Sequence, residues 1–246
     1  MTEKKRERSS AGKKDNYQIY LRQINALARV ARLISSGMYL DELLKLIVHV
    51  TAEVMQSKIC SLMLLDPETK ELVIKSTQLV SERYNNKPNI KLGEGIAGMV
   101  AKDNKLLCSR DVRKDRRYVN REIARSEAIV SLASVPLAVK GKVIGALNCY
   151  TSEEHEFSPA ELDILTTVAA QAAAAIENAE LDLRARSAEE ALQTRKLIER
   201  AKEILSQDAN MPPSEAFRLI QKQSMDKRKS MKEIAEAIIL AKDIRS

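Results

Sequence analysis

The sequence contains no tryptophan, and aromatic residues make up only 3% of its 246 positions. A large planar cofactor would therefore find few rings on which to stack. The three cysteines lack metal-ligand spacing, and their odd number predicts reduced thiols rather than a disulfide framework. No Ser/His/Asp set and no paired carboxylates indicate catalysis. We therefore expect neither a metal centre nor an enzyme, and the sequence leaves any cofactor unidentified.

Long apolar runs are also missing. No stretch reaches the roughly 18 apolar residues that a membrane-spanning helix needs. The N-terminal segment MTEKKRERSSAGKK has no apolar centre of the kind found in a signal peptide. These absences predict a cytoplasmic protein without a membrane partner.

The net charge of +7 is concentrated at the two ends of the chain. Residues 1–15 hold six lysines and arginines against three acidic residues, residues 184–246 hold fourteen against ten, and residues 16–183 are balanced. A charged tail such as 1–15 is typical of a disordered segment. A positive excess on a small C-terminal domain favours a partner with a phosphate backbone, although helix surfaces are often mildly basic without one.

Helical periodicity marks three segments in the first two thirds of the chain. Apolar residues recur every three or four positions over 17–34, which predicts a helix that either joins a dimer bundle or packs on its own domain. A second amphipathic helix is predicted at 41–56. A third begins with Ser158 as N-cap and Pro159 at its first position, and continues through an alanine-rich stretch past Leu183.

Between these helices the apolar period changes to two, which is typical of strands. The predicted strands are 58–65, 72–77, 104–111, 130–139 and 143–150. Short turns join the first two strands and the last two strands, which predicts two hairpins. The sequence therefore indicates an α+β fold with an antiparallel sheet.

Residues 93–98 read Gly-Glu-Gly-Ile-Ala-Gly, which formally matches the G-x-G-x-x-G pattern of dinucleotide sites. That site needs a buried strand before the glycines, a crossover helix after them and an acidic residue about 20 positions later. Here the preceding segment is Asn-Lys-Pro-Asn-Ile-Lys-Leu, and the following helix is short and ends near Asp103. The context disfavours a nucleotide site.

Several short motifs, in order, resemble a GAF domain. They are 92–101, 107–112, 134–137, 141–148 and 157–161, and they contain five of the seven glycines of the chain. The resemblance implies an antiparallel sheet with helices on one face and a pocket for a small-molecule ligand on the other.

The ligand of this pocket is not identified by the sequence. The Asn-Lys-x-Phe signature of cyclic-nucleotide-binding members is absent, and the cysteines show no bilin-anchoring pattern. Strand alternation directs about half of the strand residues away from the helices. The residues expected to line the pocket are Ser61, Met63, Cys108 and Asn148. The arginine-rich segment 110–125, predicted as a loop, either clamps an anionic ligand or forms an ion-paired surface.

The last sixty residues divide into three amphipathic helices. The first covers about 187–207, the second follows Pro212-Pro213, and the third opens with a capping box formed by Ser230 and Glu233. Residues 192–205, 215–219 and 234–238 resemble the ANTAR domain, which binds RNA in bacterial transcription antitermination regulators. The family usually has glycine and methionine at two positions where this chain has Glu203 and Ser206, and an acidic residue near the RNA face weakens the expected affinity.

The resemblance implies that lysines and arginines of these helices hold RNA phosphates. The candidate RNA-binding residues are Arg195, Lys202, Arg218, Lys222, Ser224, Arg228 and Lys229. Phe217 is the only nearby aromatic residue and is expected in the core, so base stacking would fall to arginine. The implied partners are stem-loops in mRNA leaders, one for each bundle of a homodimer, whose binding promotes antitermination.

We therefore predict three regions: a disordered basic tail at 1–15, a GAF sensor domain with an N-terminal dimerisation helix at 16–183, and an ANTAR three-helix bundle at 184–246. A continuous connecting helix of about 45 residues would span roughly 70 Å. We further hypothesise a parallel homodimer, in which a seam of α-helical residues pairs with its symmetry mate. The residues of this seam are Ala169, Ala172, Ile176, Ala179 and Leu183.

Two other functions compete with this interpretation. A DNA-binding transcription regulator would need a recognition helix rich in Arg, Asn or Gln at its start, whereas the third C-terminal helix begins Ser-Met-Lys-Glu. A GAF-type methionine sulfoxide reductase would need cysteine thiols that converge on one pocket. All three cysteines fall in predicted strands, where they serve either as small buried hydrophobes or as redox sensors.

Overall fold

The computed structural model describes residues 39–78, 81, 84 and 87–245. The predicted tail at 1–15 and the predicted helix at 17–34 lie outside the described residues. The chain divides into two compact units, Met1–Glu180 and Leu181–Ser246.

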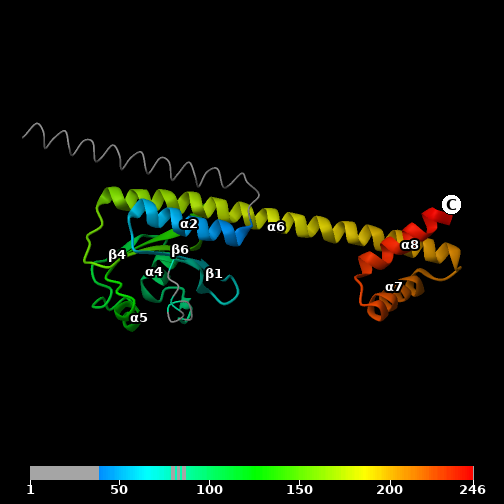
Figure 1. Cartoon of the computed structure of the whole chain (residues 1–246), viewed down its shortest axis with the longest axis horizontal. Coiled ribbons are helices and arrows are strands. Elements are labelled where there is room, and N and C mark those ends of the chain that lie inside the picture. The colour runs from blue at the N-terminus through cyan, green and yellow to red at the C-terminus, as the bar shows by residue number, and fades with distance from the viewer. Residues whose placement is uncertain (1–38, 79–80, 82–83, 85–86, 246) are drawn as a thin grey trace, which may run out of the picture. The chain divides into compact units, whose positions relative to one another are not determined.

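The first unit is built on a six-stranded sheet with the strand order β3-β2-β1-β6-β5-β4 (Figure 1). The strands are β1 (Ile59–Leu65), β2 (Glu71–Thr77), β3 (Ile90–Lys91), β4 (Leu107–Ser109), β5 (Ser131–Val139) and β6 (Lys142–Thr151). All neighbouring strands are antiparallel. This arrangement confirms the predicted fold class, and it lacks the parallel βαβ unit that a dinucleotide site would need.

Both predicted hairpins are present. Strands β5 and β6 are joined by Lys140 and Gly141 alone, which have φ angles of 50° and 81°. Two consecutive residues with positive φ match the twist of the flanking strands in a two-residue hairpin. Local turn chemistry therefore fixes the register of the two longest strands.

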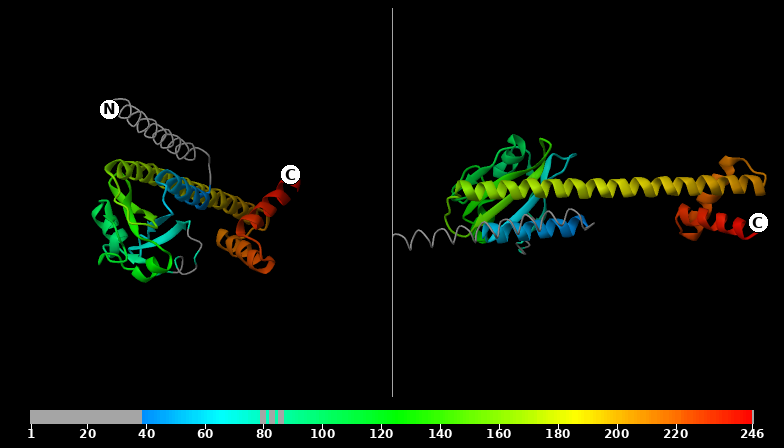
Figure 2. Two further views of the ribbon diagram at one scale, coloured as in Figure 1. Left: turned by 60° about the vertical axis from the view of Figure 1, so that its left-hand side comes forward. Right: turned by 90° about the horizontal axis from the view of Figure 1, so that it is seen from above.

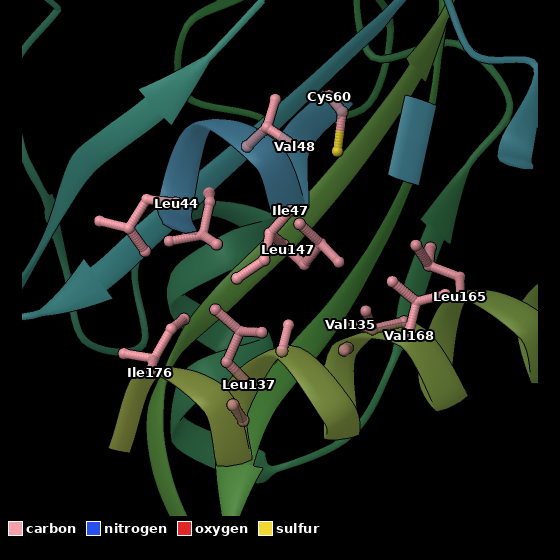
Figure 3. Packing of buried hydrophobic residues seen from close by; sticks show 14 of the residues in the cluster. Leu44, Ile47, Val48, Cys60, Val135, Leu137, Leu147, Leu165, Val168 and Ile176 are labelled. Atoms are coloured by element: carbon pink, nitrogen blue, oxygen red, sulfur yellow. The ribbon is translucent and has the colours of Figure 1, made fainter. Parts of the chain in front are cut away.

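One face of the sheet is covered by α2 (Leu40–Met55) and by the N-terminal part of α6 (Pro159–Asp208), as Figures 1 and 2 show. Side chains from both helices and from the central strands form one buried cluster (Figure 3). Leu44 and Ile47 of α2, Leu147 of β6, and Leu165 and Ile176 of α6 all belong to it. Burying each such side chain contributes about 1.5–3 kcal/mol.

The opposite face carries α4 (Gly95–Asp103) and α5 (Arg121–Ser126) over a second buried cluster. Residues 121–125 were predicted as part of a loop, and this prediction is wrong because they lie in α5. The helix is too short to show a period, and Ala124 is its only buried residue. The strand predicted at 104–111 is also shorter than expected, because Asn104 adopts a left-handed conformation and ends α4.

Helix α6 begins after the predicted N-cap residue Ser158, which forms a capping box with Glu161. The amide N of Ser158 donates to Glu161 Oε2 at 2.7 Å, and the amide N of Glu161 donates to Ser158 Oγ at 3.3 Å. The predicted dimer seam is wrong for its first three residues. Ala169, Ala172 and Ile176 are buried within their own unit, because the same stripe packs on the sheet.

The second unit is the predicted three-helix bundle, formed by the C-terminal part of α6, α7 (Pro213–Lys227) and α8 (Met231–Arg245). Its buried core consists of Ala201, Ile220, Ile234, Ala235 and Ile239. The predicted capping box opens α8: the Ser230 amide donates to Glu233 Oε2 at 2.8 Å, and the Glu233 amide donates to Ser230 Oγ at 3.2 Å.

The close packing of Gly98 in α4 gives a test of the fold. A methyl group added at Gly98 would lie 2.4 Å from the carbonyl oxygen of Lys91, which is backbone. Replacing glycine by alanine inside a helix usually stabilises by about 1 kcal/mol. Here we expect Gly98→Ala to lower the free energy of unfolding by roughly 1–3 kcal/mol, as other overpacked sites do. Urea unfolding measures the difference, and a more stable variant would contradict the structure.

Candidate functional site

The surface of the second unit exposes an aromatic ring beside a lysine. Phe217 on α7 is 40% exposed and does not belong to the buried core of the bundle. The Nζ of Lys202 on α6 lies 5.9 Å from the centre of this ring and 2.8 Å from Glu199 Oε2. The prediction that Phe217 is a core residue is wrong, because Ala216 and Ile220, one helical turn apart, form the inward stripe of α7.

Three predicted phosphate-binding residues have exposed, unpaired charges. Arg195 lies on α6, and Arg218 and Lys222 lie one turn apart on α7. None of the three forms an ion pair with another residue in the part of the chain that the structure describes. Arg195 shares a shallow groove of about 420 Å³ with Glu203, so the acidic departure from the ANTAR pattern stands beside a candidate RNA contact.

The remaining three candidates meet at the turn between α7 and α8. Ser224 Oγ donates a hydrogen bond to the carbonyl oxygen of Lys229 at 2.5 Å, so this hydroxyl closes the turn. Arg228 is exposed and has a φ of 52°. Lys229 Nζ lies 3.7 Å from Glu233 Oε1. The turn therefore presents the Arg228 guanidinium, which has no ion-pair partner among the described residues, and a partly neutralised ammonium at Lys229.

In the first unit, a chain of buried polar side chains crosses the sheet on the face opposite α2 and α6. Tyr84 Oη donates to Ser61 Oγ at 3.2 Å, Asn148 Nδ2 donates to the same oxygen at 3.4 Å, and Ser134 Oγ donates to Asn148 Oδ1 at 2.7 Å. Met63 lies in the hydrophobic cluster of this face. Three of the four predicted pocket residues, Ser61, Met63 and Asn148, therefore lie on the same face of the sheet.

Cys108 is the exception, because its side chain packs against the cluster under α2 and α6. Strand β4 has only three residues, and Leu107 takes the position on the polar face. The placement of Cys108 in the predicted pocket is therefore wrong.

Sequence reasoning missed Tyr84, Lys87 and Ser134 on this face. The ring of Tyr84 packs edge-on against Tyr150, with ring centres 6.5 Å apart, and Lys87 Nζ lies 4.0 Å from the centre of the Tyr84 ring. Burial raises the pKa of Tyr118 and of Tyr150, so both phenols stay neutral at physiological pH. No apolar period in the segment around Tyr84 could have revealed this arrangement.

Four of the seven cations of the arginine-rich segment, Arg110, Arg113, Lys114 and Arg117, form ion pairs. Arg113 and Lys114 both contact the Asp111 carboxylate, at 2.8 and 3.0 Å, and hydrogen bonds from Arg113 hold the pKa of Asp111 well below its usual range. The Arg117 guanidinium contacts Asp115 at 2.7 Å and lowers the pKa of that carboxyl to about 2. These cations are already neutralised, which disfavours the alternative that they clamp an anion.

The thiols do not converge on the polar face. Cys60 and Cys149 are opposite one another on β1 and β6, with their sulfur atoms 3.8 Å apart, and both lie in the cluster under α2 and α6. Burial raises the pKa of the Cys60 thiol, which lowers its reactivity. Register places Cys108, Ala133, Cys149 and Cys60 in one row across four strands.

Two further properties concern the described residues as a whole. They contain no group of three or more His, Cys, Asp or Glu side chains able to hold a metal ion. Among the helices they form, none combines the length and the apolar character required to cross a membrane.

Comparison with known families assigns both units. Residues 38–177 match the GAF domain model, and residues 186–239 match the ANTAR domain model. The chain is a GAF-domain protein with a C-terminal ANTAR domain. Its GAF unit is similar to the GAF domain of a phosphoenolpyruvate-protein phosphotransferase from Coxiella burnetii, with a TM-score of 0.59 and 26% identity over 68% of this chain and 98% of that one.

Two curated proteins are related to separate parts of the chain. A methyl sulfide methyltransferase-associated sensor of Methanosarcina acetivorans is 29% identical over 171 residues, which are 68% of this chain and 17% of the sensor. The transcriptional regulatory protein PdtaR of Mycobacterium tuberculosis is 46% identical over 50 residues, which are 20% of this chain and 24% of PdtaR. The GAF–ANTAR chain therefore spans a quarter or less of either relative.

A third likeness concerns the fold alone. The free methionine-R-sulfoxide reductase of Neisseria meningitidis shares a TM-score of 0.56 at 19% identity, over 65% of this chain and 91% of the reductase.

The Arg117–Asp115 pair predicts a pH dependence of stability. The Asp115 carboxyl has a pKa of about 2 in the folded protein, against roughly 3.9 in an unfolded chain. Its pairing therefore stabilises the fold above about pH 4, and this contribution is lost as the pH falls toward 2. We expect Asp115→Asn to lower the thermal midpoint at neutral pH, with the difference from wild type shrinking between about pH 4 and pH 2.

The exposed Asp163 on α6 supplies a matched control, because no ion pair of its side chain exists within the described residues. Asp163→Asn should track the wild type at every pH. If the difference in thermal midpoint between Asp115→Asn and the wild type stayed constant down to pH 2, the lowered pKa of Asp115 would not be the cause of that difference.

Proposed function

We propose that this GAF–ANTAR protein is a cytoplasmic transcription regulator that binds stem-loop RNA in leader transcripts and promotes antitermination. Its ANTAR unit makes the RNA contact, and its GAF unit senses a small ligand. The observation that carries the proposal is the exposed Phe217 ring beside Lys202, on a helix that also carries Arg218 and Lys222, two exposed cations without an ion-pair partner among the described residues.

This surface has both elements that loop RNA requires. Unpaired loop bases stack on aromatic rings, while lysines and arginines hold the flanking phosphates. Stacking of one base on an aromatic side chain contributes about 1–3 kcal/mol. The ring of Phe217 offers the apolar plane, and Lys202, Arg218 and Lys222 offer the charges. We therefore assign base stacking to Phe217 rather than to arginine.

The two competing functions receive less support. In a DNA-binding regulator the start of α8 would read bases, but Glu233 is held there by the capping box with Ser230. In a reductase the thiols would meet at the polar pocket, whereas Cys60 and Cys149 lie on the opposite face of the sheet. A binding regulator accounts for the whole chain, and an enzyme leaves the ANTAR unit unused.

We infer a homodimer through a stripe of α6 that differs from the predicted seam and does not include its last residue, Leu183. Leu181, Ala185, Ala188 and Leu192 are all exposed and recur at steps of four, three and four residues. This spacing places them on one stripe of the helix. Leu181 and Leu192 are 53% and 52% exposed, and an apolar stripe of this kind is stabilised when a second copy covers it.

Mutation of the stripe tests the dimer. Leu192→Asp places a charge on the stripe, and we expect it to convert a dimer into a monomer in light scattering coupled to size-exclusion chromatography. Leu183→Asp is the matched control, because Leu183 is 62% exposed but lies two residues from Leu181 and so faces away from the stripe. Dimers in both variants, or monomers in both, would overturn the assignment.

RNA binding is tested through its salt dependence. Each phosphate contact to a single-stranded region adds about 0.7 to the slope of log affinity against log salt. The double variant Arg218→Ala/Lys222→Ala should weaken binding of a stem-loop RNA and reduce this slope by about 1.4, measured by fluorescence anisotropy. Lys232→Ala, an exposed lysine on α8, should leave the slope unchanged. Equal affinity for duplex DNA would contradict an RNA function.

Phe217→Leu separates stacking from charge, because leucine keeps an apolar side chain but has no ring. We expect this variant to bind the stem-loop about 10- to 100-fold more weakly, with the salt slope of the wild type. Met225→Leu, a change at another exposed apolar residue of α7, should bind normally. Loss of binding in both variants would point to damage of the helix rather than to a lost base contact.

A further inference from the structure

Two buried thiols face each other on the central strands of the sheet. Cys60 on β1 is opposite Cys149 on β6 in the antiparallel register, and their sulfur atoms are 3.8 Å apart. Both side chains are fully buried, and both thiols are free. Neither takes part in the proposed RNA contact. A pair of thiols held this closely has a reaction that a single thiol lacks, which is closure to a disulfide.

The backbone geometry of the pair suits that bond. The carbonyl oxygen of Cys60 accepts a hydrogen bond from the Gln78 amide at 3.3 Å, and the Cys60 amide donates to Gln78 Oε1 at 3.3 Å. Both backbone groups of Cys60 are therefore directed away from β6, so its pairing with Cys149 is of the non-hydrogen-bonded kind. Such residues have Cα atoms about 4.5 Å apart, and a disulfide spans Cα separations of about 4.4–6.8 Å. The strands need not slide or separate for the bond to form.

Cys108 shares the row of thiols but has no partner within reach. It is opposite Ala133 on β5, and Ala133 is in turn opposite Cys149. Two strand spacings, or about 9.5 Å, separate Cys108 from Cys149, which is too far for a disulfide. The sheet therefore contains one matched pair and one isolated thiol.

A cavity at the end of β1 and β6 provides a route to the pair. It has a volume of about 340 Å³ and is lined by Ser57 and Lys58, which precede β1, and by Thr151, the last residue of β6. Thr151 follows Cys149 by two residues, so strand alternation directs both side chains to one face, about 7 Å apart. Hydrogen peroxide is uncharged and close to water in size. A molecule of peroxide in this cavity is therefore near the thiols.

We propose that Cys60 and Cys149 are an oxidative modification site, which hydrogen peroxide converts into a cross-strand disulfide. One thiolate attacks the peroxide: an S–O bond forms, the O–O bond breaks, and the departing hydroxide takes up the thiol proton to give water. The second thiol then attacks the sulfenic sulfur: the S–S bond forms, the S–O bond breaks, and a second water leaves. The two thiols lose two electrons and two protons, and the peroxide takes up both.

The position of the pair gives the reaction a low rate and a structural consequence. Burial raises the pKa of the Cys60 thiol, so little thiolate is present at neutral pH. Closure brings the sulfur atoms from 3.8 Å to about 2 Å, inside a close-packed cluster that also includes Val48 of α2 and Val168 of α6. Intracellular disulfides are typically transient and redox-sensing. The site goes beyond the proposed RNA function and does not depend on it.

Peptide mapping of the full chain tests the site. The reduced protein is treated with hydrogen peroxide at mildly alkaline pH, blocked with iodoacetamide in urea and digested with trypsin. The sequence places the three cysteines in separate tryptic peptides, 59–70, 106–110 and 143–184. We expect peptides 59–70 and 143–184 to be recovered as one disulfide-linked species, lighter by two hydrogen atoms than their sum. Dithiothreitol should restore the free thiols, and peptide 106–110 should remain unlinked.

Three variants assign the bond to the pair. Cys108→Ala is the matched control and should form the disulfide at the rate of the wild type. Cys60→Ala and Cys149→Ala should each lose it completely under the same treatment. Urea unfolding of the reduced variants shows whether each remains folded, and the mapping of the wild type does not depend on them.

Three results would contradict the site. One is a disulfide that contains Cys108 within a single chain. Another is recovery of Cys60 and Cys149 as free thiols after Cys108 has been fully oxidised. The third is a disulfide that forms only when urea is added before the peroxide. The binding of stem-loop RNA by Phe217→Leu is measured on reduced protein, so failure of either proposal leaves the other intact.

Discussion

Burial of the alanine-rich face of α6 against the sheet determines which surfaces of that helix remain exposed. Ala169, Ala172 and Ile176 are fully buried in the same cluster as Leu44 of α2 and Leu147 of β6. Small side chains allow the helix to approach the sheet closely, and close-packed interiors tolerate little change in volume. The same unbroken helix then supplies Ala201 to the core of the ANTAR unit. One helix thus contributes side chains to two cores, and the exposed stripe between them is the part that we propose for the dimer contact.

The two faces of the sheet have different chemistry because of strand alternation. On the face under α2 and α6, the strands present mainly aliphatic side chains together with the thiols of Cys60, Cys108 and Cys149. On the other face, the buried polar side chains Ser61, Ser134 and Asn148 form hydrogen bonds with one another. Buried polar groups are stabilising only when all are paired.

Local signals in the sequence predicted most of the fold. The Ser-x-x-Glu boxes at Ser158 and Ser230 and the two-residue turn at Gly141 depend on neighbouring residues alone, so they were read correctly. The functional surfaces depend on packing between distant segments and were read less well. Phe217 borders the apolar stripe of α7, and a helical period does not show on which side of that border a residue falls. Lys87 and Tyr84 come from a segment without any period, so nothing in the sequence connected them with Ser61.

The row of cysteines across the sheet has a practical consequence. Cys108 lies on the edge strand and is partly exposed, while Cys149 and Cys60 stand further along the row and are inaccessible. Edge strands open more readily than central ones. Alkylation of this protein should therefore proceed in two phases. The Cys108 thiol is labelled when the edge strand opens locally, and the Cys149 and Cys60 thiols are labelled only on global unfolding. The native cysteines would therefore distinguish local opening of the edge strand from global unfolding, without any introduced probe.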